Sequence, residues 1–106
     1  MARQDPLDAK LPKRESAVQR RVVKAYEDNG WEVIVFSQPR GHLQTPGIPD
    51  LGVFTGQRMF WHETKRVRGK QSQAQALFQI RVERAGMDYV LGGEKEALDY
   101  AATHTS

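Results

Sequence analysis

The sequence predicts a small α/β domain in which helices flank a mixed β-sheet. The first observation is length, because 106 residues have room for one hydrophobic core and no second domain. The second is the order of the periodic segments, which is helix, three strands, helix, strand, helix. That order implies a mixed sheet covered by helices.

The N-terminal third is predicted to contain an arm, a helix and a strand. Residues 1–12 are polar and contain two prolines, and we expect a flexible arm ahead of a single domain over residues 13–106. Residues 13–28 have helical periodicity, and the Asn-Gly pair that follows is a typical helix stop. Residues 31–36 are β-branched and aromatic, so we expect a strand there.

The middle of the chain is predicted to hold a long loop and a β-hairpin. Residues 37–49 contain three prolines and two glycines, and loops of this length in small domains are usually functional or disordered. Leu51–Phe54 and Met59–Arg66 indicate two strands joined by residues 55–58.

The C-terminal third is predicted to form a helix, a strand and a final helix. After a basic loop over residues 67–71, Ser72 is a good N-cap for a helix over Gln73–Arg84, and a glycine follows the end of that helix. Met87–Leu91 indicates a short strand, and Glu94–Ala102 a short helix.

The composition excludes several classes of protein. Without cysteine there are no disulfides, cysteine-zinc sites, iron–sulfur clusters or thiol catalysis. No apolar run approaches the roughly 20 residues of a membrane helix, and the polar N-terminus does not read as a signal peptide. We therefore expect a cytoplasmic protein with no membrane partner. A hydrophobic fraction of 39% gives a thin core, which favours a dimer.

The net charge of +3 conceals an alternation along the chain. Residues 1–24 and 58–84 carry an excess of +4 and +5, whereas residues 25–57 and 85–106 each carry −3. This pattern fits a basic face that meets a polyanion.

The hairpin carries the clearest candidate site. If residues 55–58 form a four-residue loop, Asp50 lies directly opposite Glu63, with Cβ atoms roughly 5 Å apart. Two carboxylates this close repel each other unless a cation lies between them, and oxygen ligands suit Mg²⁺ or Mn²⁺. Lys65 shares the face of Glu63 and would stabilise charge on a phosphoryl group. The alternative is that all three are solvated strand-end charges with a weak surface ion pair.

Three polar residues lie on helix faces that are expected to be buried. Glu15 and Gln19 fall inside the apolar stripe of the first helix, where a carboxylate is costly unless it is paired or bound to a metal. Gln75 borders the inward stripe of the second helix, where a buried amide needs partners. The alternatives are that Glu15 only stabilises the helix start and that Gln75 is half-exposed.

These residues together resemble the VRR-NUC family, a branch of the PD-(D/E)XK nuclease superfamily. The likeness runs over most of the chain and consists of three ordered motifs. They are Gly47-Ile48-Pro49-Asp50-Leu51, His62-Glu63-Thr64-Lys65, and Gly69-Lys70-Gln71-Ser72-Gln73-Ala74-Gln75 before a helix that ends at Gly86. One departure is the Gln-Ser-Gln over residues 71–73, where the family often has Leu-Ser-Pro; it softens the expected helix start.

The resemblance implies a small restriction-endonuclease-like core that hydrolyses phosphodiester bonds with Mg²⁺ or Mn²⁺. The positions that match the family's catalytic residues are Asp50, Glu63, Lys65, Glu15 and Gln75. Among them Asp50 and Glu63 match metal ligands, together with the backbone carbonyl of Thr64, and Lys65 matches the catalytic lysine.

Similar stand-alone proteins of this size, from phages and bacteria, act as homodimers on four-way (Holliday) DNA junctions. The resemblance therefore implies branched DNA as substrate, a homodimer, and a bacterial cell or phage-infected host as location. Leu77 and Ile80 lie on the outward side of their helix, and we expect either a dimer contact there or coverage by the C-terminal helix.

Basic side chains around this site are candidates for DNA phosphate contacts. They lie in the loop before Asp50, after Glu63 and on the first helix, and they are Arg40, His42, Arg66, Arg68, Lys70, Arg20, Arg21 and Lys24. Phosphate contacts set affinity and salt sensitivity rather than sequence choice. The alternative is a solvated charged surface. His62 faces away from Glu63 and is interpreted as a residue that packs or supports the site, not as a metal ligand.

The leading hypothesis from sequence is thus a metal-dependent, structure-selective DNA endonuclease. Two others stay open. One is a nuclease-like fold that only binds nucleic acid or a partner, and the other is a nuclease that acts on RNA or on other nucleic-acid structures.

Overall fold

A computed structural model describes residues 13–37, 45–65 and 69–105, with side chains from residue 17 onward. The elements are α1 (Lys13–Glu27), β1 (Glu32–Val35), β2 (Leu51–Phe54), β3 (Met59–Thr64), α2 (Gln73–Arg84), β4 (Tyr89–Gly92) and α3 (Glu94–His104). This order is the predicted one. The expected arm over residues 1–12 lies outside the described residues.

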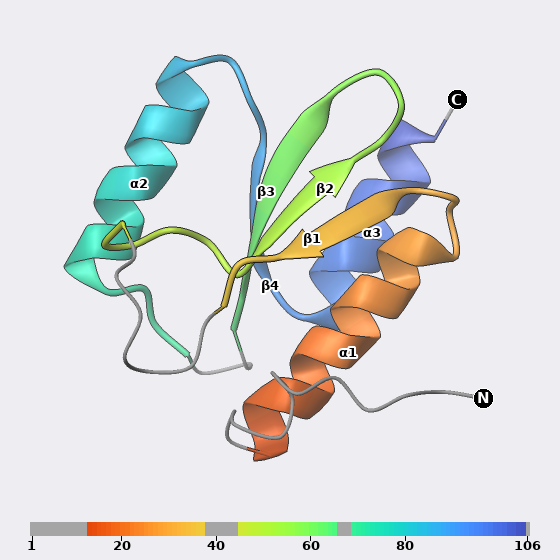
Figure 1. The fold of residues 1–106 in the computed structure, drawn as a ribbon, viewed down its shortest axis with the longest axis horizontal. Helices are drawn as coiled ribbons and strands as arrows, with labels where there is room; N and C mark the ends of the chain where they lie inside the picture. The colour runs from red at the N-terminus through yellow and green to blue at the C-terminus, as the bar shows by residue number, and fades with distance from the viewer. Residues whose placement is uncertain (1–12, 38–44, 66–68, 106) are drawn as a thin grey trace.

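The four strands form one mixed sheet in the order β1-β2-β3-β4 (Figure 1). Strands β1, β2 and β3 pair antiparallel, and β4 pairs parallel to β3 after the chain passes through α2. Phe54 pairs with Met59 and Leu51 with His62, which is the register predicted for a four-residue hairpin loop. The mixed sheet flanked by helices is therefore confirmed.

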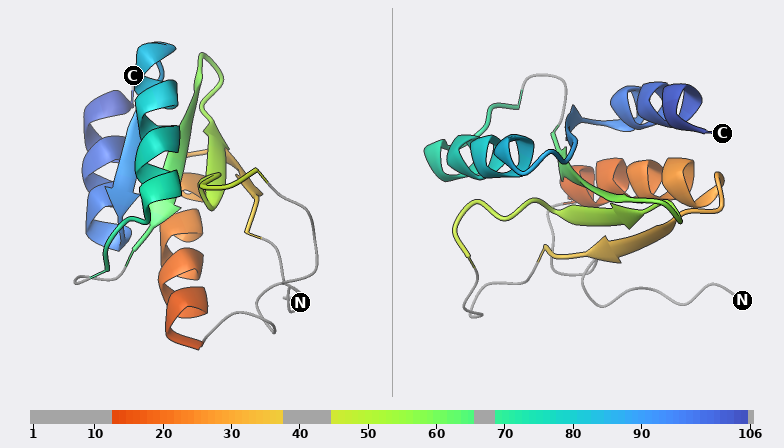
Figure 2. Two further views of the ribbon diagram at one scale, coloured as in Figure 1. Left: turned by 90° about the vertical axis from the view of Figure 1, so that its left-hand side faces the viewer. Right: turned by 90° about the horizontal axis from the view of Figure 1, so that it is seen from above.

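Two helices cover one side of the sheet and the third lies apart from them. Helices α1 and α3 pack against each other, and in Figures 1 and 2 they lie together on one side of the strands. Helix α2 stands on the other side in Figure 1 and contacts β4. The strand alternation explains this division, because Phe60 contacts Tyr26 of α1 whereas its neighbour Trp61 contacts Phe78 of α2.

The core lies between the sheet and the α1–α3 pair. Its buried members are Val22, Ala25, Tyr26, Leu51, Val53, Phe60 and Ala97. Aromatic rings dominate the contacts. Tyr26 stacks on Trp31 with ring centroids 5.9 Å apart, and Phe60 lies 4.2 Å from Tyr100. Aromatic pairs of this kind add stability beyond the area that they bury.

Element boundaries differ from the predicted ones by one to two residues. β3 ends at Thr64, and β4 begins at Tyr89, where its parallel pairing with Trp61 starts. Helix α3 continues past residue 102 to His104, because the amide of Thr105 still donates to the carbonyl of Ala101. Local periodicity does not encode the partner that sets such an end.

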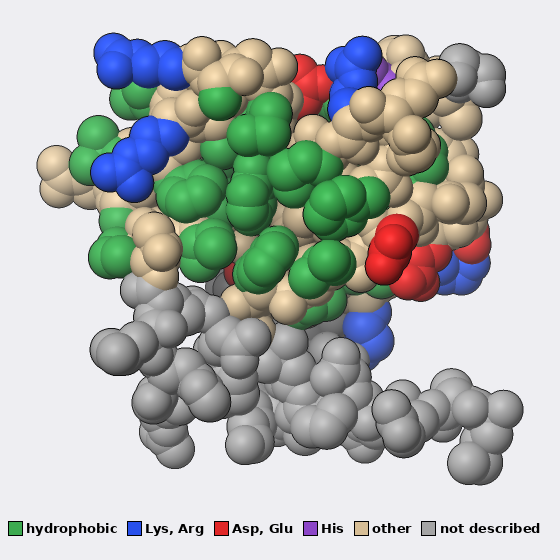
Figure 3. All heavy atoms as spheres, turned by 45° about the horizontal axis from the view of Figure 1, so that its top comes forward, with side chains coloured by type: hydrophobic (Ala, Val, Ile, Leu, Met, Phe, Trp, Pro, Cys, Tyr) green, Lys and Arg blue, Asp and Glu red, His purple; other side chains and the backbone are tan. Residues whose placement is uncertain are grey.

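Large apolar side chains remain exposed on the side of the sheet that faces away from the core. Leu77 and Ile80 of α2 are 54% and 46% exposed, so the expectation that α3 covers them is wrong. Ile34 of β1 and Leu91 of β4 are also exposed. Figure 3 shows hydrophobic side chains gathered in one broad area of the surface. An exposed apolar area of this kind typically marks an interaction surface.

Candidate active site

The predicted acidic pair lies at the end of the two central strands. Asp50 directly precedes β2, and Glu63 is the penultimate residue of β3. The register pairs Leu51 with His62, and one further step sets Asp50 opposite Glu63, as predicted. Lys65 directly follows β3, where its amide donates to the carbonyl of Gly92 (3.0 Å).

Three donors orient the Asp50 carboxylate. Oδ2 accepts from the backbone amide of Thr64 at 3.1 Å and also from the Thr64 hydroxyl. Oδ1 accepts from the hydroxyl of Ser37, which follows β1, at 3.2 Å. The carboxylate is therefore fixed between β1 and β3 before any ligand arrives.

Glu63 is a buried carboxylate with one unpartnered oxygen. The residue is 2% exposed. Its Oε2 accepts from Nε2 of Gln75 at 2.8 Å and lies 3.6 Å from Nζ of Lys65. Its Oε1 is buried and has no hydrogen-bond partner among the described residues. Burial raises the pKa of Glu63 to about 8, the charge of Asp50 adds to the rise, and Lys65 opposes it.

A capping box at the start of α2 aims Gln75 at Glu63. The backbone amide of Ser72 donates to Oε1 of Gln75 at 2.8 Å, and the amide of Gln75 donates to the Ser72 hydroxyl at 3.1 Å. Because Oε1 is held in this way, the amide nitrogen points toward Glu63. Gln75 is half-buried and is bonded to Glu63, and the unusual Gln-Ser-Gln sequence leaves the helix start fully capped.

Gly47 lets the segment that carries Asp50 lie against α2. Its φ of 80° favours glycine. A Cβ built at this position would also overlap the backbone carbonyl of Ala74. The loop therefore touches the first turn of α2, which carries Gln75. Sequence reasoning missed this contact, and the only signal for it was a glycine shortly before Asp50.

Gln19 and Ser37 are two site residues that sequence reasoning did not assign. Gln19 lies on the buried face of α1, as predicted, and is 5% exposed. Its Oε1 lies 3.0 Å from the Ser37 hydroxyl oxygen, which lies 3.2 Å from Oδ1 of Asp50. The apolar stripe gave a signal for Gln19, but no pattern marked Ser37. Glu15 lies in α1 one turn before Gln19, and its side chain is not described.

His62 belongs to the core. It is fully buried; Tyr26 Oη lies 2.5 Å from Nδ1, and Nε2 lies 3.0 Å from the carbonyl of Gly92. These contacts define one tautomer, in which Tyr26 donates to Nδ1 and Nε2 donates to the carbonyl. Burial lowers the pKa of His62 to about 4, so the ring is neutral near pH 7. The interpretation of His62 as a packing residue is confirmed.

The predicted phosphate-binding residues fall into two groups. Arg40, His42, Arg66 and Arg68 lie outside the described residues. The exposed residues Arg20, Arg21, Lys24 and Lys70 lie on α1 and just before α2.

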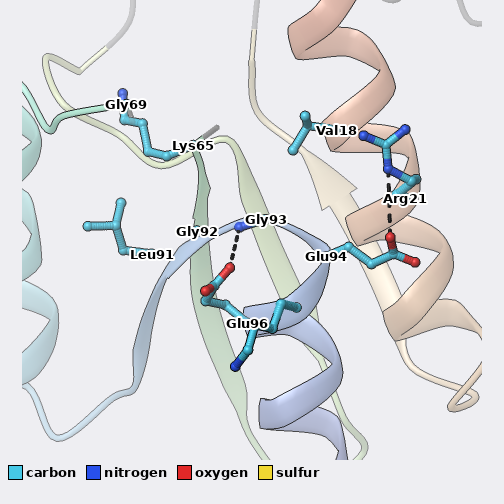
Figure 4. A pocket seen from close by; sticks show the side chains of 10 residues that line it. Val18, Arg21, Lys65, Gly69, Leu91, Gly92, Gly93, Glu94 and Glu96 are labelled. Carbon is cyan, nitrogen blue, oxygen red and sulfur yellow. Dashed lines mark hydrogen bonds and ion pairs between the residues drawn. The ribbon is translucent and has the colours of Figure 1, made fainter. Parts of the chain in front are cut away.

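One of these basic residues shares a cavity of about 600 Å³ with Lys65. Lys65 and Arg21 line it, together with the start of α3 (Figure 4). Arg21 lies 3.7 Å from Glu94 there, and Lys24 pairs with Asp28 on the surface of α1. Arg21 is therefore the described α1 cation that shares a cavity with Lys65.

Comparison with known proteins identifies the fold. No known family profile matches the sequence, and no curated protein matches it. A solved structure described as a VRR_NUC domain superposes with a TM-score of 0.67 at 23% identity, over 88% of this chain and 98% of that chain. The chain therefore has the nuclease-like fold of a VRR_NUC domain, as the resemblance implied.

The described part of the chain contains neither a larger cluster of metal-binding side chains nor a membrane-spanning helix. There, no three acidic, histidine or cysteine side chains converge on one point, so the carboxylate pair stands without a third side chain of these types. Within the same ranges, no helix is both long and apolar enough to cross a membrane.

Proposed function

We propose that the chain is a metal-dependent DNA endonuclease that hydrolyses phosphodiester bonds. One observation carries the proposal. At the strand ends of a VRR_NUC fold, the buried carboxylate of Glu63 has one oxygen without a hydrogen-bond partner among the described residues, and both Asp50 and Lys65 act on its charge. Buried groups without a partner are rare and costly, so this oxygen indicates a ligand.

The donor set fits Mg²⁺ or Mn²⁺. Asp50 and Glu63 would hold the cation with the backbone carbonyl of Thr64, because these ions prefer carboxylate and carbonyl oxygens. Such an ion, when bound, supplies a Lewis acid and lowers the pKa of bound water. A bound cation would contact Oε1 of Glu63, which has no partner among the described residues, and would offset both the burial and the Asp50 charge that raise the pKa of Glu63.

The protein's own groups prepare the site for a phosphodiester. Gln75 holds one oxygen of Glu63, while Ser37 and Thr64 hold Asp50. The Lys65 side chain is 20% exposed, so its ammonium is partly desolvated and would stabilise negative charge that develops on the phosphoryl oxygens. We further propose Glu15 as an acidic residue of the same site; it precedes Gln19 of α1 by one helical turn.

The substrate we propose is DNA, recognised through its phosphates. Lys70 and the α1 residues Arg20, Arg21 and Lys24 are exposed. They would contact the backbone together with Arg40, His42, Arg66 and Arg68. Contacts of this kind fix position and orientation without reading bases, so DNA shape would decide selectivity.

We further propose a homodimer that acts on branched DNA such as four-way junctions. Leu77 and Ile80 are both exposed on α2, and an isologous contact would cover them in both copies. Two copies related by a two-fold axis present two active sites, which suits paired cuts in a branched substrate.

A cleavage assay tests the proposal. Labelled four-way junctions, linear duplexes and RNA are incubated with Mn²⁺ and either the wild-type protein or Asp50→Ala. We expect cleavage of the junction by the wild type alone. Equal cleavage by both proteins would exclude this mechanism. Binding without cleavage of any substrate would favour a nucleic-acid-binding module instead, and the solution mass tests the dimer.

A further inference from the structure

Ser37, which is half-buried, and Gln19, which is buried, form a hydrogen-bonded pair next to Asp50. The Ser37 hydroxyl lies 3.2 Å from Oδ1 of Asp50 and 3.0 Å from Oε1 of Gln19. The three residues come from separate parts of the chain, because Gln19 belongs to α1, Ser37 follows β1 and Asp50 precedes β2. Gln19 is 5% exposed, so it has little water with which to exchange this bond.

The Ser37 hydroxyl faces two hydrogen-bond acceptors, Oδ1 of Asp50 and Oε1 of Gln19. A serine hydroxyl carries one proton, and the two oxygens that it faces are both acceptors. Ser37 therefore donates to Asp50 or to Gln19, but not to both. A rotation of the hydroxyl moves the proton from one acceptor to the other without moving any heavy atom.

We propose that Ser37 and Gln19 are positioning residues that adjust how readily Asp50 takes up a divalent cation. Ser37 donates to Asp50 while the carboxylate is free. If a cation took the place of that hydrogen bond at Oδ1, the hydroxyl would turn and donate to Gln19, so this half-buried donor would keep a protein partner. This inference rests on the proposed role of Asp50 as a metal ligand.

Gln19 therefore determines whether the Ser37 hydroxyl still has a hydrogen-bond acceptor when a cation binds Asp50. Without the amide oxygen, the hydroxyl would lose its partner whenever the cation displaced it from Asp50. The cation would then compete directly with the Ser37–Asp50 hydrogen bond. Residues that hydrogen-bond to a metal ligand typically change the affinity of the site for the metal by about 10- to 100-fold.

The test is a double-mutant cycle on Mn²⁺ binding, measured without DNA by the electron paramagnetic resonance signal of free Mn²⁺. Gln19→Met keeps the length of the side chain and removes the acceptor. We expect it to weaken Mn²⁺ binding about tenfold in the wild-type background. In the Ser37→Ala background, which has no hydroxyl to satisfy, the same substitution should change binding less than about twofold. An equal loss in both backgrounds would show that Gln19 acts only by packing, and would overturn the proposal.

Two further variants keep the result interpretable. Gln19→Glu retains an oxygen toward Ser37, so it should bind Mn²⁺ at least as tightly as the wild type; weaker binding would contradict the proposal even if Gln19→Met fails to fold. Asp50→Ala separates the two levels of inference. If it binds Mn²⁺ like the wild type, the metal site itself is wrong. If it loses Mn²⁺ while Gln19→Met binds normally, only the role of the pair is wrong.

Discussion

The carboxylates at the two ends of the central strands have different surroundings. Asp88 directly precedes β4, and its backbone carbonyl accepts from Trp61 of β3. Its side chain accepts from Tyr100 at 2.6 Å and lies 4.0 Å from Arg58 and 3.8 Å from His104. One carboxylate thus meets an uncharged donor, a cation and an imidazole, and it links the hairpin, β4 and α3.

The opposite end of the strands holds two carboxylates instead of one, and therefore more negative charge. Burial and the charge of Asp50 raise the pKa of Glu63, and Nζ of Lys65 lies 3.6 Å from Oε2 of Glu63. One oxygen of Glu63 has no partner among the described residues. A fold keeps such an arrangement at the expense of stability, as active sites commonly do. The same chemical change should therefore have opposite effects at the two ends.

The largest effect is expected from Glu63→Gln. The substitution removes a proposed metal ligand, so cleavage of a four-way junction should fall by more than about 100-fold. Because the amide carries no charge to bury, the free energy of unfolding at pH 8 without metal should rise. Single-turnover cleavage and urea unfolding measure the two effects. Glu83→Gln on the exposed face of α2 is the matched control and should change neither. Retained cleavage, or a loss of stability, would contradict the comparison.

The next effect concerns the contact that joins the Asp50 loop to α2. Gly47 and Gly30 have nearly the same φ, 80° and 82°. A Cβ at Gly30 meets nothing within 4 Å, whereas one at Gly47 overlaps the carbonyl of Ala74. Alanine at either position should cost about 1 kcal/mol or more for the left-handed backbone. Only Gly47→Ala should also displace α2 and slow cleavage by at least about tenfold, since small misplacements of reacting groups are costly. Equal cleavage rates in the two variants would show that this contact does not position the site.

The parts of the site that could be predicted are those governed by periodicity. The loop length of the hairpin fixed its register, and the register placed Asp50 opposite Glu63. Helical spacing put Gln75 and Gln19 on inward faces, where the structure finds them bonded. Ser37 could not be predicted, because its role depends on how the end of β1 approaches α1.

The remaining misses have the same physical origin. The contact of Gly47 with α2 and the start of β4 depend on segments that are distant in sequence and meet only in the folded chain. Neither produces a repeating pattern. A single residue that acts through one tertiary contact leaves no trace in local periodicity, whereas a whole strand or helix does.

The stability of the protein should depend on pH through the buried carboxylate of Glu63. Glu63 has a pKa of about 8 in the folded protein against an ordinary value of 4.5, so the folded protein retains a proton that the unfolded chain releases. The stabilising contribution is complete below the ordinary value and is lost as the pH rises through about 8. In EDTA, the free energy of unfolding should therefore fall between pH 5 and pH 8, by at most about 1.4 kcal/mol per pH unit. Urea unfolding across this range measures the slope, which Glu63→Gln should reduce. An unchanged slope in that variant would assign the pH dependence to other groups.

The smallest effect is expected at the far end, from Asp88→Asn. The amide oxygen can still accept from Tyr100, so the hydrogen bond at 2.6 Å has a replacement. Arg58 and His104 would no longer face a negatively charged side chain. Both lie about 4 Å from Oδ2 of Asp88 and are exposed to solvent, and ion pairs of this kind contribute about 1 kcal/mol or less. The melting temperature should fall by a few degrees, about 4–8 °C per kcal/mol, and junction cleavage below that temperature should not change.

Asp88→Asn and Glu63→Gln both convert a carboxylate to its amide at the two ends of paired strands. If the first lowers stability and spares cleavage while the second does the reverse, the two ends differ in purpose and not only in burial. A loss of cleavage in Asp88→Asn well below its melting temperature would instead mean that the far end also supports the chemistry, and the division drawn between the two ends would be wrong.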